Sequence, residues 1–268
     1  MFFVGENQSD GIVESKSILL IEQKKGYDRV MLDQIKSDLS QLSDPEKAKN
    51  LSWFFKTGKG QYGEGDVFWG ISVPEQRKIA ERYVDLPLSD IQELISSKIH
   101  EHRLTAILIL ISKYQKADNL GKDGIFSFYL NNTANINNWD LVDLSAPKIV
   151  GDYLVDKDTS VLFELAKSSN LWERRIAILS TFKFIANDDF EDALSISELL
   201  LHDEHDLIHK AVGWALREIG KRDQEIEEQF LRKHHMDMPR TMLRYAIEKF
   251  VENKRTFYLS KKLRNNLK

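Results

Sequence analysis

The chain has 268 residues, of which 42% are hydrophobic, enough for a folded core in one domain or two. It has neither an apolar run of about eighteen residues nor a signal peptide, so the sequence predicts a soluble, cytoplasmic protein that does not enter a membrane. The absence of cysteine excludes disulfides, thiolate nucleophiles and cysteine-ligated metals. The net charge of −4 disfavours a nucleic-acid partner, but residues 244–268 hold eight basic and two acidic residues, a net charge of +6. That asymmetry permits a basic surface on an otherwise acidic protein.

Residues 1–26 are polar and poorly patterned, and we expect them to form an N-terminal extension or a loose first helix. Residues 27–268 are predicted to form a single repeat domain. Apolar residues recur at helical spacing along this part, as in 30–42, 104–111 and 171–182, whereas alternating strand-like runs are rare.

The starts of several helices are marked by proline, which favours the first turn: Pro45, Pro74 and Pro239. A glycine-rich stretch over 58–70 predicts a loop between early helices. From about residue 86 onward, helix pairs of roughly 30 to 45 residues follow one another, which is the period of HEAT-like repeats. We therefore expect an all-α protein, a curved right-handed solenoid of HEAT-like helical repeats whose inner surface is free to bind a partner.

The segment 137–143 reads Asn-Asn-Trp-Asp-Leu-Val-Asp, and an asparagine can cap the helix that begins there. Trp139 and Asp143 are four residues apart and share one helix face, whereas Asp140 points elsewhere. An indole face and a carboxylate together suit a cationic ligand. The alternative interpretation is a half-buried tryptophan beside a solvated aspartate.

A second cluster places Lys210, Trp214 and Arg217 along one side of a helix. Gly213, in the middle of that helix, indicates a close approach either of a ligand or of the next helix. The alternative interpretation of Trp214 is an ordinary core residue.

The segment 171–176 carries two adjacent arginines, Arg174 and Arg175, which diverge by about 100° on a helix, so only one can face inward. We expect Arg175 to do so and to offer its guanidinium to a phosphate, and Arg174 to pair with solvent or an acidic group. A surface salt bridge is the alternative for Arg175.

Metal and nucleotide chemistry are disfavoured, and we expect neither a metal nor a cofactor. His202, His205 and His209 have a spacing that can align three imidazoles on a helix, but the pattern that pairs two zinc ligands with a general base is absent. The glycines of 58–70 do not form a phosphate-binding loop, because no strand precedes them.

Taken together, these motifs resemble the bacterial DNA alkylation repair family of the AlkD type. The resemblance covers about residues 28–252 and rests on five segments in order: 62–74, which begins Tyr-Gly-Glu-Gly-Asp; 138–143; 171–175; 210–214, Lys-Ala-Val-Gly-Trp; and 238–246, which begins Met-Pro-Arg-Thr.

The resemblance implies a HEAT-like DNA glycosylase that hydrolyses the N-glycosidic bond of cationic alkylated purines, N3-methyladenine and N7-methylguanine, in double-stranded DNA. It implies that Trp139, Asp143 and Trp214 are catalytic and that Arg175 lies near the backbone of the lesion. Lys210 and Arg217 are expected to bind DNA as well. Many relatives have a tyrosine where this chain has Phe54, so a phosphate contact there is in doubt. We expect a monomer that associates with the nucleoid when it is bound to DNA.

The chemistry agrees with this interpretation, because a cationic purine leaves as a neutral base without a general acid, and a fixed carboxylate can stabilise the charge that forms on the sugar. Two other classes stay open. The first is a catalytically inactive HEAT-like protein that binds damaged or branched DNA, and the second is a protein-interaction scaffold, which needs no basic inner surface.

Overall fold

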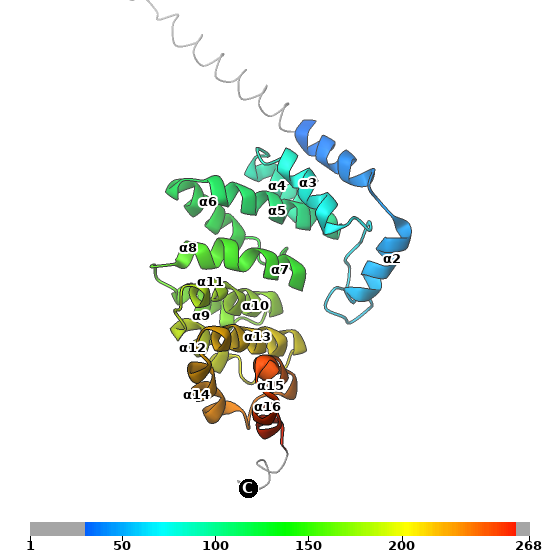
Figure 1. The fold of residues 1–268 in the computed structure, drawn as a ribbon. Coiled ribbons are helices and arrows are strands. Elements are labelled where there is room, and N and C mark those ends of the chain that lie inside the picture. The colour runs from blue at the N-terminus through cyan, green and yellow to red at the C-terminus, as the bar shows by residue number, and fades with distance from the viewer. Residues whose placement is uncertain (1–29, 261–268) are drawn as a thin grey trace, which may run out of the picture. The chain divides into compact units, whose positions relative to one another are not determined.

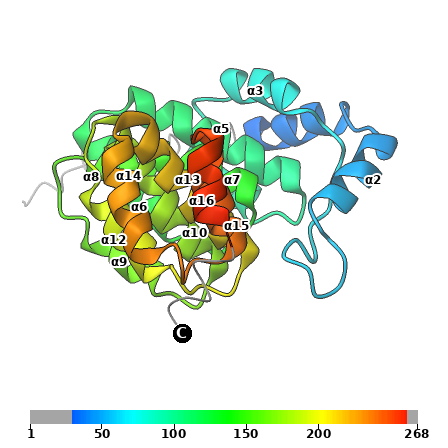
Figure 2. The same ribbon diagram turned by 60° about the horizontal axis from the view of Figure 1, so that its bottom comes forward.

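The computed structural model describes residues 30–260 and divides the chain into two compact units, Met1–Lys113 and Tyr114–Lys268. Both units are built from helices (Figures 1 and 2), and an isolated bridge between Val67 and Ile99 is the only β-type pairing among residues 30–260. The predicted all-α, helical-repeat fold is confirmed. None of the described helices is long and apolar enough to cross a membrane. The predicted extension over residues 1–26 lies outside the described residues.

The first unit contains short helices joined by loops. Its elements are a helix over residues 30–40, α2 (Pro45–Phe54), α3 (Val73–Arg82), α4 (Leu88–Ile95) and most of α5 (His100–Lys116). Pro45 occupies the first turn of α2, and the Asp44 side chain caps this helix by accepting backbone hydrogen bonds from Glu46 and Lys47. The prediction that proline opens this helix is confirmed.

The glycine-rich segment forms the predicted loop between α2 and α3, and two buried acidic residues hold it in place. The carboxylate of Glu101 accepts hydrogen bonds from the backbone N–H groups of Trp69 at 3.0 Å and Gly70 at 2.7 Å. Asp66 pairs with Arg103 at 2.7 Å, and both side chains are buried. Glu101 and Asp66 therefore provide acceptors for buried backbone N–H groups and for the buried guanidinium of Arg103.

The second unit continues the helical pattern to residue 260. Its elements are α6 (Asn119–Leu130), α7 (Trp139–Ala146), the π-helical turn η1 (Pro147–Gly151), α8 (Asp152–Leu154), α9 (Ser160–Ala166), α10 (Leu171–Ser180), α11 (Phe182–Ala186), α12 (Glu191–Leu199), α13 (Asp206–Arg222), α14 (Gln224–His234), α15 (Arg240–Ala246), η2 (Ile247–Lys249) and α16 (Glu252–Leu259). Within this unit α7 packs on α10, α10 on α13 and α13 on α15 (Figure 1). The helices α9, α12 and α14 pack beside this row as the partners of α10 and α13.

Two helices of this row change geometry part-way along. The segment 139–154 runs from α7 through the π-helical turn into α8, and the turn begins at Pro147, which has no N–H to donate to the regular α-helical ladder. The apolar pattern over 171–182 predicts one helix, but the structure divides it after Ser180. Thr181 donates its hydroxyl to the carbonyl of Ile178 at 2.7 Å, and such side-chain bonds compete with the helical backbone pattern.

Two glycines allow the helices of the second unit to touch along their backbones. A Cβ added at Gly213 of α13 would lie 2.4 Å from the carbonyl oxygen of Met242 and 2.5 Å from the Cβ of Tyr245, both on α15. A Cβ added at Gly151 would lie 2.2 Å from the carbonyl oxygen of Ser180. The close approach expected at Gly213 is therefore made by a neighbouring helix, α15.

We predict that Gly213→Ala lowers the free energy of unfolding by about 1–3 kcal/mol, because the added methyl group meets a backbone carbonyl that cannot move away freely. Gly124 in α6 is the matched control, since a Cβ there meets nothing within 4 Å. Gly124→Ala should raise the stability by up to about 1 kcal/mol through helix propensity alone. Urea titrations of the two variants measure the difference, and a Gly213→Ala protein as stable as the wild type would contradict the close packing.

Candidate active site

The first turn of α7 presents an aromatic and an acidic side chain on one face. Asn138 is fully buried and accepts a hydrogen bond from the N–H of Trp139 at 2.9 Å, so it caps the helix as predicted. Trp139 and Asp143 follow at the first position and one turn later, and both are half-buried. The cap determines where the helix starts, and the helix then places the carboxylate one turn from the indole.

Asp143 is held by a two-pronged ion pair with Arg175 of α10. The Arg175 Nε donates to one carboxylate oxygen at 2.7 Å, and its Nη2 donates to the other at 2.8 Å. The side chain of Arg175 is 5% exposed, whereas that of Asp143 is 17% exposed. The guanidinium therefore lies behind the carboxylate, and the negative end of the pair is the more accessible one. This geometry leaves the carboxylate little freedom to rotate.

The same guanidinium reaches a third helix, because its Nη1 donates to the backbone carbonyl of Leu207 in the first turn of α13. Arg175 thereby links α7, α10 and α13. Arg174 points in a different direction and pairs with Asp203 at 2.6 Å. The divergence of the two arginines agrees with the expected helical geometry, and Arg174 has the acidic partner that was expected for it.

Burial raises the pKa of the Asp143 carboxyl above its ordinary value of 3.8, and the nearby charge of Asp140 acts in the same direction. The hydrogen bonds and positive charge of Arg175 lower this pKa but do not cancel the effect of burial. As the pH falls, Asp143 therefore loses its charge earlier than an exposed aspartate would.

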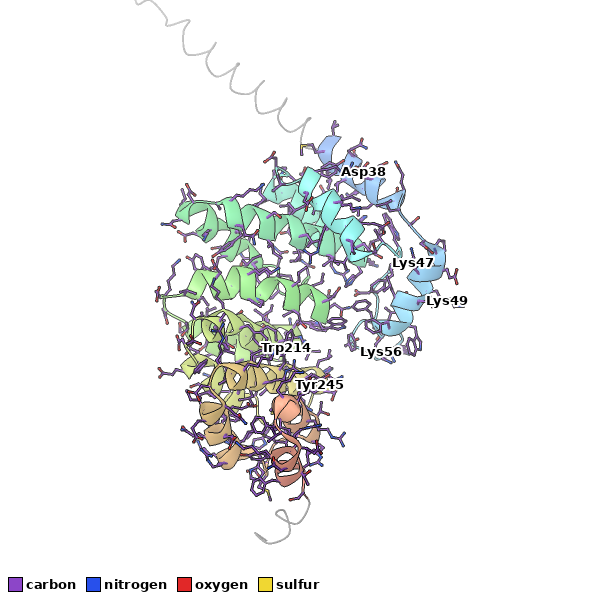
Figure 3. All side chains as sticks on the ribbon, viewed as in Figure 1. Asp38, Lys47, Lys49, Lys56, Trp214 and Tyr245 are labelled. Carbon is purple, nitrogen blue, oxygen red and sulfur yellow. The ribbon has the colours of Figure 1, made fainter. Side chains whose placement is uncertain are left out.

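Trp214 of α13 is also half-buried, and its ring orientation is determined by two contacts. The indole N–H donates to Glu218 at 2.9 Å, and the ring meets Phe182 edge to face with centroids 4.8 Å apart. Lys221 holds the same carboxylate at 2.6 Å. Sequence reasoning missed Glu218, although its position four residues after Trp214 places both on one helix face. Figure 3 shows Trp214 close to Tyr245 of α15, where Gly213 allows the two helices to meet.

The other two cations predicted to bind DNA are on α13, and acidic residues accompany both. Lys210 pairs with Asp206 one turn earlier at 2.7 Å. Arg217 pairs with Glu248 of η2 and is largely buried. Phosphate contacts by Arg175, Lys210 and Arg217 stay predictions, and each would require the cation to share or exchange the partner it has in this structure.

Two of the three histidines near α13, His205 and His209, have structural partners. His205 accepts a hydrogen bond from the N–H of Leu207 and caps the helix, and burial lowers its pKa, so the neutral form is favoured. His209 donates through Nε2 to the carbonyl of Asp203. Across residues 30–260 there is no group of three or more histidine and acidic side chains arranged to hold a metal ion.

Comparison with known proteins places this arrangement in a family. Residues 35–250 match the sequence family described as DNA alkylation repair enzyme, and this range contains every candidate site residue. The chain belongs to the DNA alkylation repair enzyme family. This membership connects the chain with the repair of alkylated DNA, and DNA is accordingly the partner expected of the family. A comparison with curated proteins gave no match.

Solved structures of this fold are similar over most of their length. A protein from Enterococcus faecalis, described as a predicted DNA alkylation repair enzyme, is 18% identical, with a TM-score of 0.61 over 78% of this chain and 97% of its own. AlkD2 from Streptococcus mutans is also 18% identical, with a TM-score of 0.51 over 84% of this chain and 99% of its own. At this identity the likeness supports the fold alone.

We predict that Arg175→Gln lowers the free energy of unfolding by about 3–5 kcal/mol, because it leaves a largely buried carboxylate without its cation. Arg222→Gln is the control, since Arg222 and its partner Asp188 form an ion pair with 43% and 67% of their side chains exposed. The loss there should be at most about 1 kcal/mol. Thermal and urea denaturation of both variants measure the contrast, and equal losses would show that the Asp143 pair is not the stronger constraint.

Proposed function

We propose that the protein is a DNA glycosylase that hydrolyses the N-glycosidic bond of cationic alkylated purines, N3-methyladenine and N7-methylguanine, in duplex DNA. The observation that carries this proposal is the Asp143 carboxylate, held from behind by Arg175 and standing one turn from Trp139. Family membership supports a role in the repair of alkylated DNA. The proposed enzyme acts as a monomer and uses no metal or cofactor.

An N-alkylated purine already carries a positive charge and leaves the sugar as a neutral base. As the glycosidic bond breaks, positive charge moves to the deoxyribose, and the requirement is a fixed negative charge rather than a proton donor. Asp143 meets this requirement in its ionised form. The same carboxylate can orient the water that attacks the sugar carbon, so the products are the free base and an abasic site.

The charge of Arg175 does not remove the electrostatic value of Asp143. The guanidinium is the more deeply buried end of the pair, and one of its nitrogens bonds the carbonyl of Leu207. A cation that approaches the exposed end therefore meets the carboxylate first. A carboxylate that is held in place stabilises charge without the cost of reorienting at the moment of reaction.

The two tryptophans supply aromatic faces for the cationic lesion or the sugar. Interactions of this kind contribute about 0.5–2 kcal/mol, depending on how much water is excluded. Glu218 and Phe182 determine the orientation of Trp214, and the Asn138 cap places Trp139 at the start of α7. We assign both tryptophans to the binding of the lesion.

The proposal is tested by Asp143→Asn with Asp140→Asn as the control. Both residues lie on α7, but the side chain of Asp140 accepts a hydrogen bond from the N–H of its neighbour Leu141. We expect Asp143→Asn to lose roughly 10²- to 10³-fold in the excision rate of N7-methylguanine, about 3–4 kcal/mol, while Asp140→Asn stays close to the wild type. Single-turnover release of free base from a duplex, followed by chromatography, measures the rate.

Circular dichroism at the assay temperature shows whether each variant is folded, which matters because the neutral amide of Asp143→Asn cannot balance the charge of Arg175. The affinity for undamaged duplex should change little. If folded Asp143→Asn excises at the wild-type rate, the catalytic assignment is wrong. If the wild type binds duplex DNA but releases no base, the protein is a catalytically inactive DNA-binding member of the family.

A further inference from the structure

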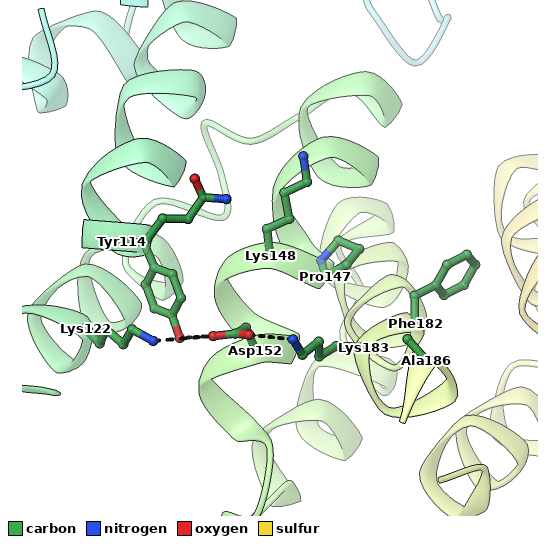
Figure 4. A pocket seen from close by; sticks show the side chains of 9 residues that line it. Tyr114, Lys122, Pro147, Lys148, Asp152, Phe182, Lys183 and Ala186 are labelled. Carbon is green, nitrogen blue, oxygen red and sulfur yellow. Dashed lines mark hydrogen bonds and ion pairs between the residues drawn. The ribbon is translucent and has the colours of Figure 1, made fainter. Parts of the chain in front are cut away.

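The second unit contains a cavity of about 500 Å³ that the proposed chemistry does not use. Figure 4 shows its walls, which come from the end of α5 and from α6, η1, α8 and α11. Charged side chains around it are three lysines and one aspartate: Lys122, Lys148, Lys183 and Asp152. These charges leave the cavity with two positive charges in excess.

Two lining residues of the cavity connect it with the candidate active site. Pro147, one of its lining residues, lies four residues after Asp143 on the continuous helical segment 139–154. Phe182, another lining residue, makes the edge-to-face contact with Trp214. A ligand that contacts Asp143 and Trp214 would therefore lie next to two lining residues of the cavity.

Asp152 neutralises part of the positive charge of the cavity, but not all of it. Its carboxylate pairs with Lys183 at 2.8 Å and Lys122 at 3.6 Å, and it accepts a hydrogen bond from the Tyr114 hydroxyl at 3.1 Å (Figure 4). Burial tends to raise the pKa of Asp152, but the hydrogen bonds from Lys183 and Tyr114 outweigh it and lower this pKa. Asp152 is therefore an anion that positions two lysines, and one negative charge does not balance both of them.

Lys148 is the cation of this cavity that remains available. It is exposed and forms no ion pair with any residue between 30 and 260. It belongs to the π-helical turn that begins at Pro147, and such turns are frequently found at functional sites. Figure 4 shows the side chain of Lys148 pointing away from Asp152 and the residues that contact Asp152.

We propose that this cavity binds a phosphodiester group of the DNA backbone, with Lys148 as the contact. This inference rests on the proposed function, because it places another part of the same duplex next to the lesion site. Lysine ammonium groups act as point charges for phosphate, and three of them line the cavity, whereas Gln115 contributes the one side-chain amide of the lining. The contact therefore positions the DNA and carries no sequence preference.

The test compares Lys148→Ala with Lys167→Ala. Lys167 is the C-cap of α9, is exposed, and does not line the cavity, so its replacement removes the same charge from another place on the second unit. Binding of an undamaged duplex is titrated at several salt concentrations. We expect Lys148→Ala to weaken binding about 3- to 10-fold at low salt and to reduce the slope of log affinity against log salt by about one, the value for one phosphate contact. Lys148→Arg should restore both, and Lys167→Ala should match the wild type.

Equal affinities and slopes for Lys148→Ala and Lys167→Ala would overturn the phosphate site. A second result would also overturn it: inorganic phosphate raises the melting temperature of the wild type but not of Lys148→Ala, while the two proteins bind DNA equally well. The cavity would then bind a free anion rather than the DNA backbone. The proposed function is read separately, from N7-methylguanine release by the wild type. If the wild type releases the base but Lys148→Ala binds DNA like the wild type, only the phosphate site is wrong. If the wild type binds no duplex at any salt concentration, both the phosphate site and the proposed function are wrong.

Discussion

The arrangement of the second unit depends on where the Arg175 guanidinium is placed. A buried guanidinium is costly unless each of its donors finds an acceptor, and here the acceptors come from α7 and α13 on either side of α10. Satisfying this one cation therefore fixes three neighbouring helices at once. It also leaves the more exposed end of the ion pair as a carboxylate, which is the end that a cationic substrate would meet.

Backbone packing makes the second contribution to the site. Gly213 lets α13 approach α15 so closely that no side chain fits between them, and Gly151 does the same where the π-helical turn meets the end of α10. These backbone contacts hold the helices that carry Trp214 and Asp143 in position without polar side chains. The ring of Trp214 is then oriented by Glu218 and Phe182.

Local sequence patterns predicted the helices well, because capping residues and apolar spacing act within one or two turns. The cap at Asn138, the shared face of Trp139 and Asp143, and the divergence of Arg174 and Arg175 all follow from helical geometry alone. The pairing of Asp143 with Arg175 was not predictable in this way, since the two residues lie on different helices and Arg175 was expected to bind a phosphate. The bond to the backbone carbonyl of Leu207 could not be predicted from the sequence, because every residue has a carbonyl group. The break after Ser180 was missed because the sequence does not show which partner the Thr181 hydroxyl takes.

The proposed mechanism depends on stabilising charge rather than on donating a proton, and substrate choice tests this most directly. Matched duplexes that contain N7-methylguanine, N3-methyladenine, hypoxanthine or uracil are offered together, and the released bases are separated by chromatography. The two cationic bases should appear and the two neutral ones should not, because His205 and His209 have structural partners and Asp143 acts as an anion. Efficient release of hypoxanthine or uracil would show that a general acid operates in this site and would contradict a mechanism centred on the Asp143 carboxylate.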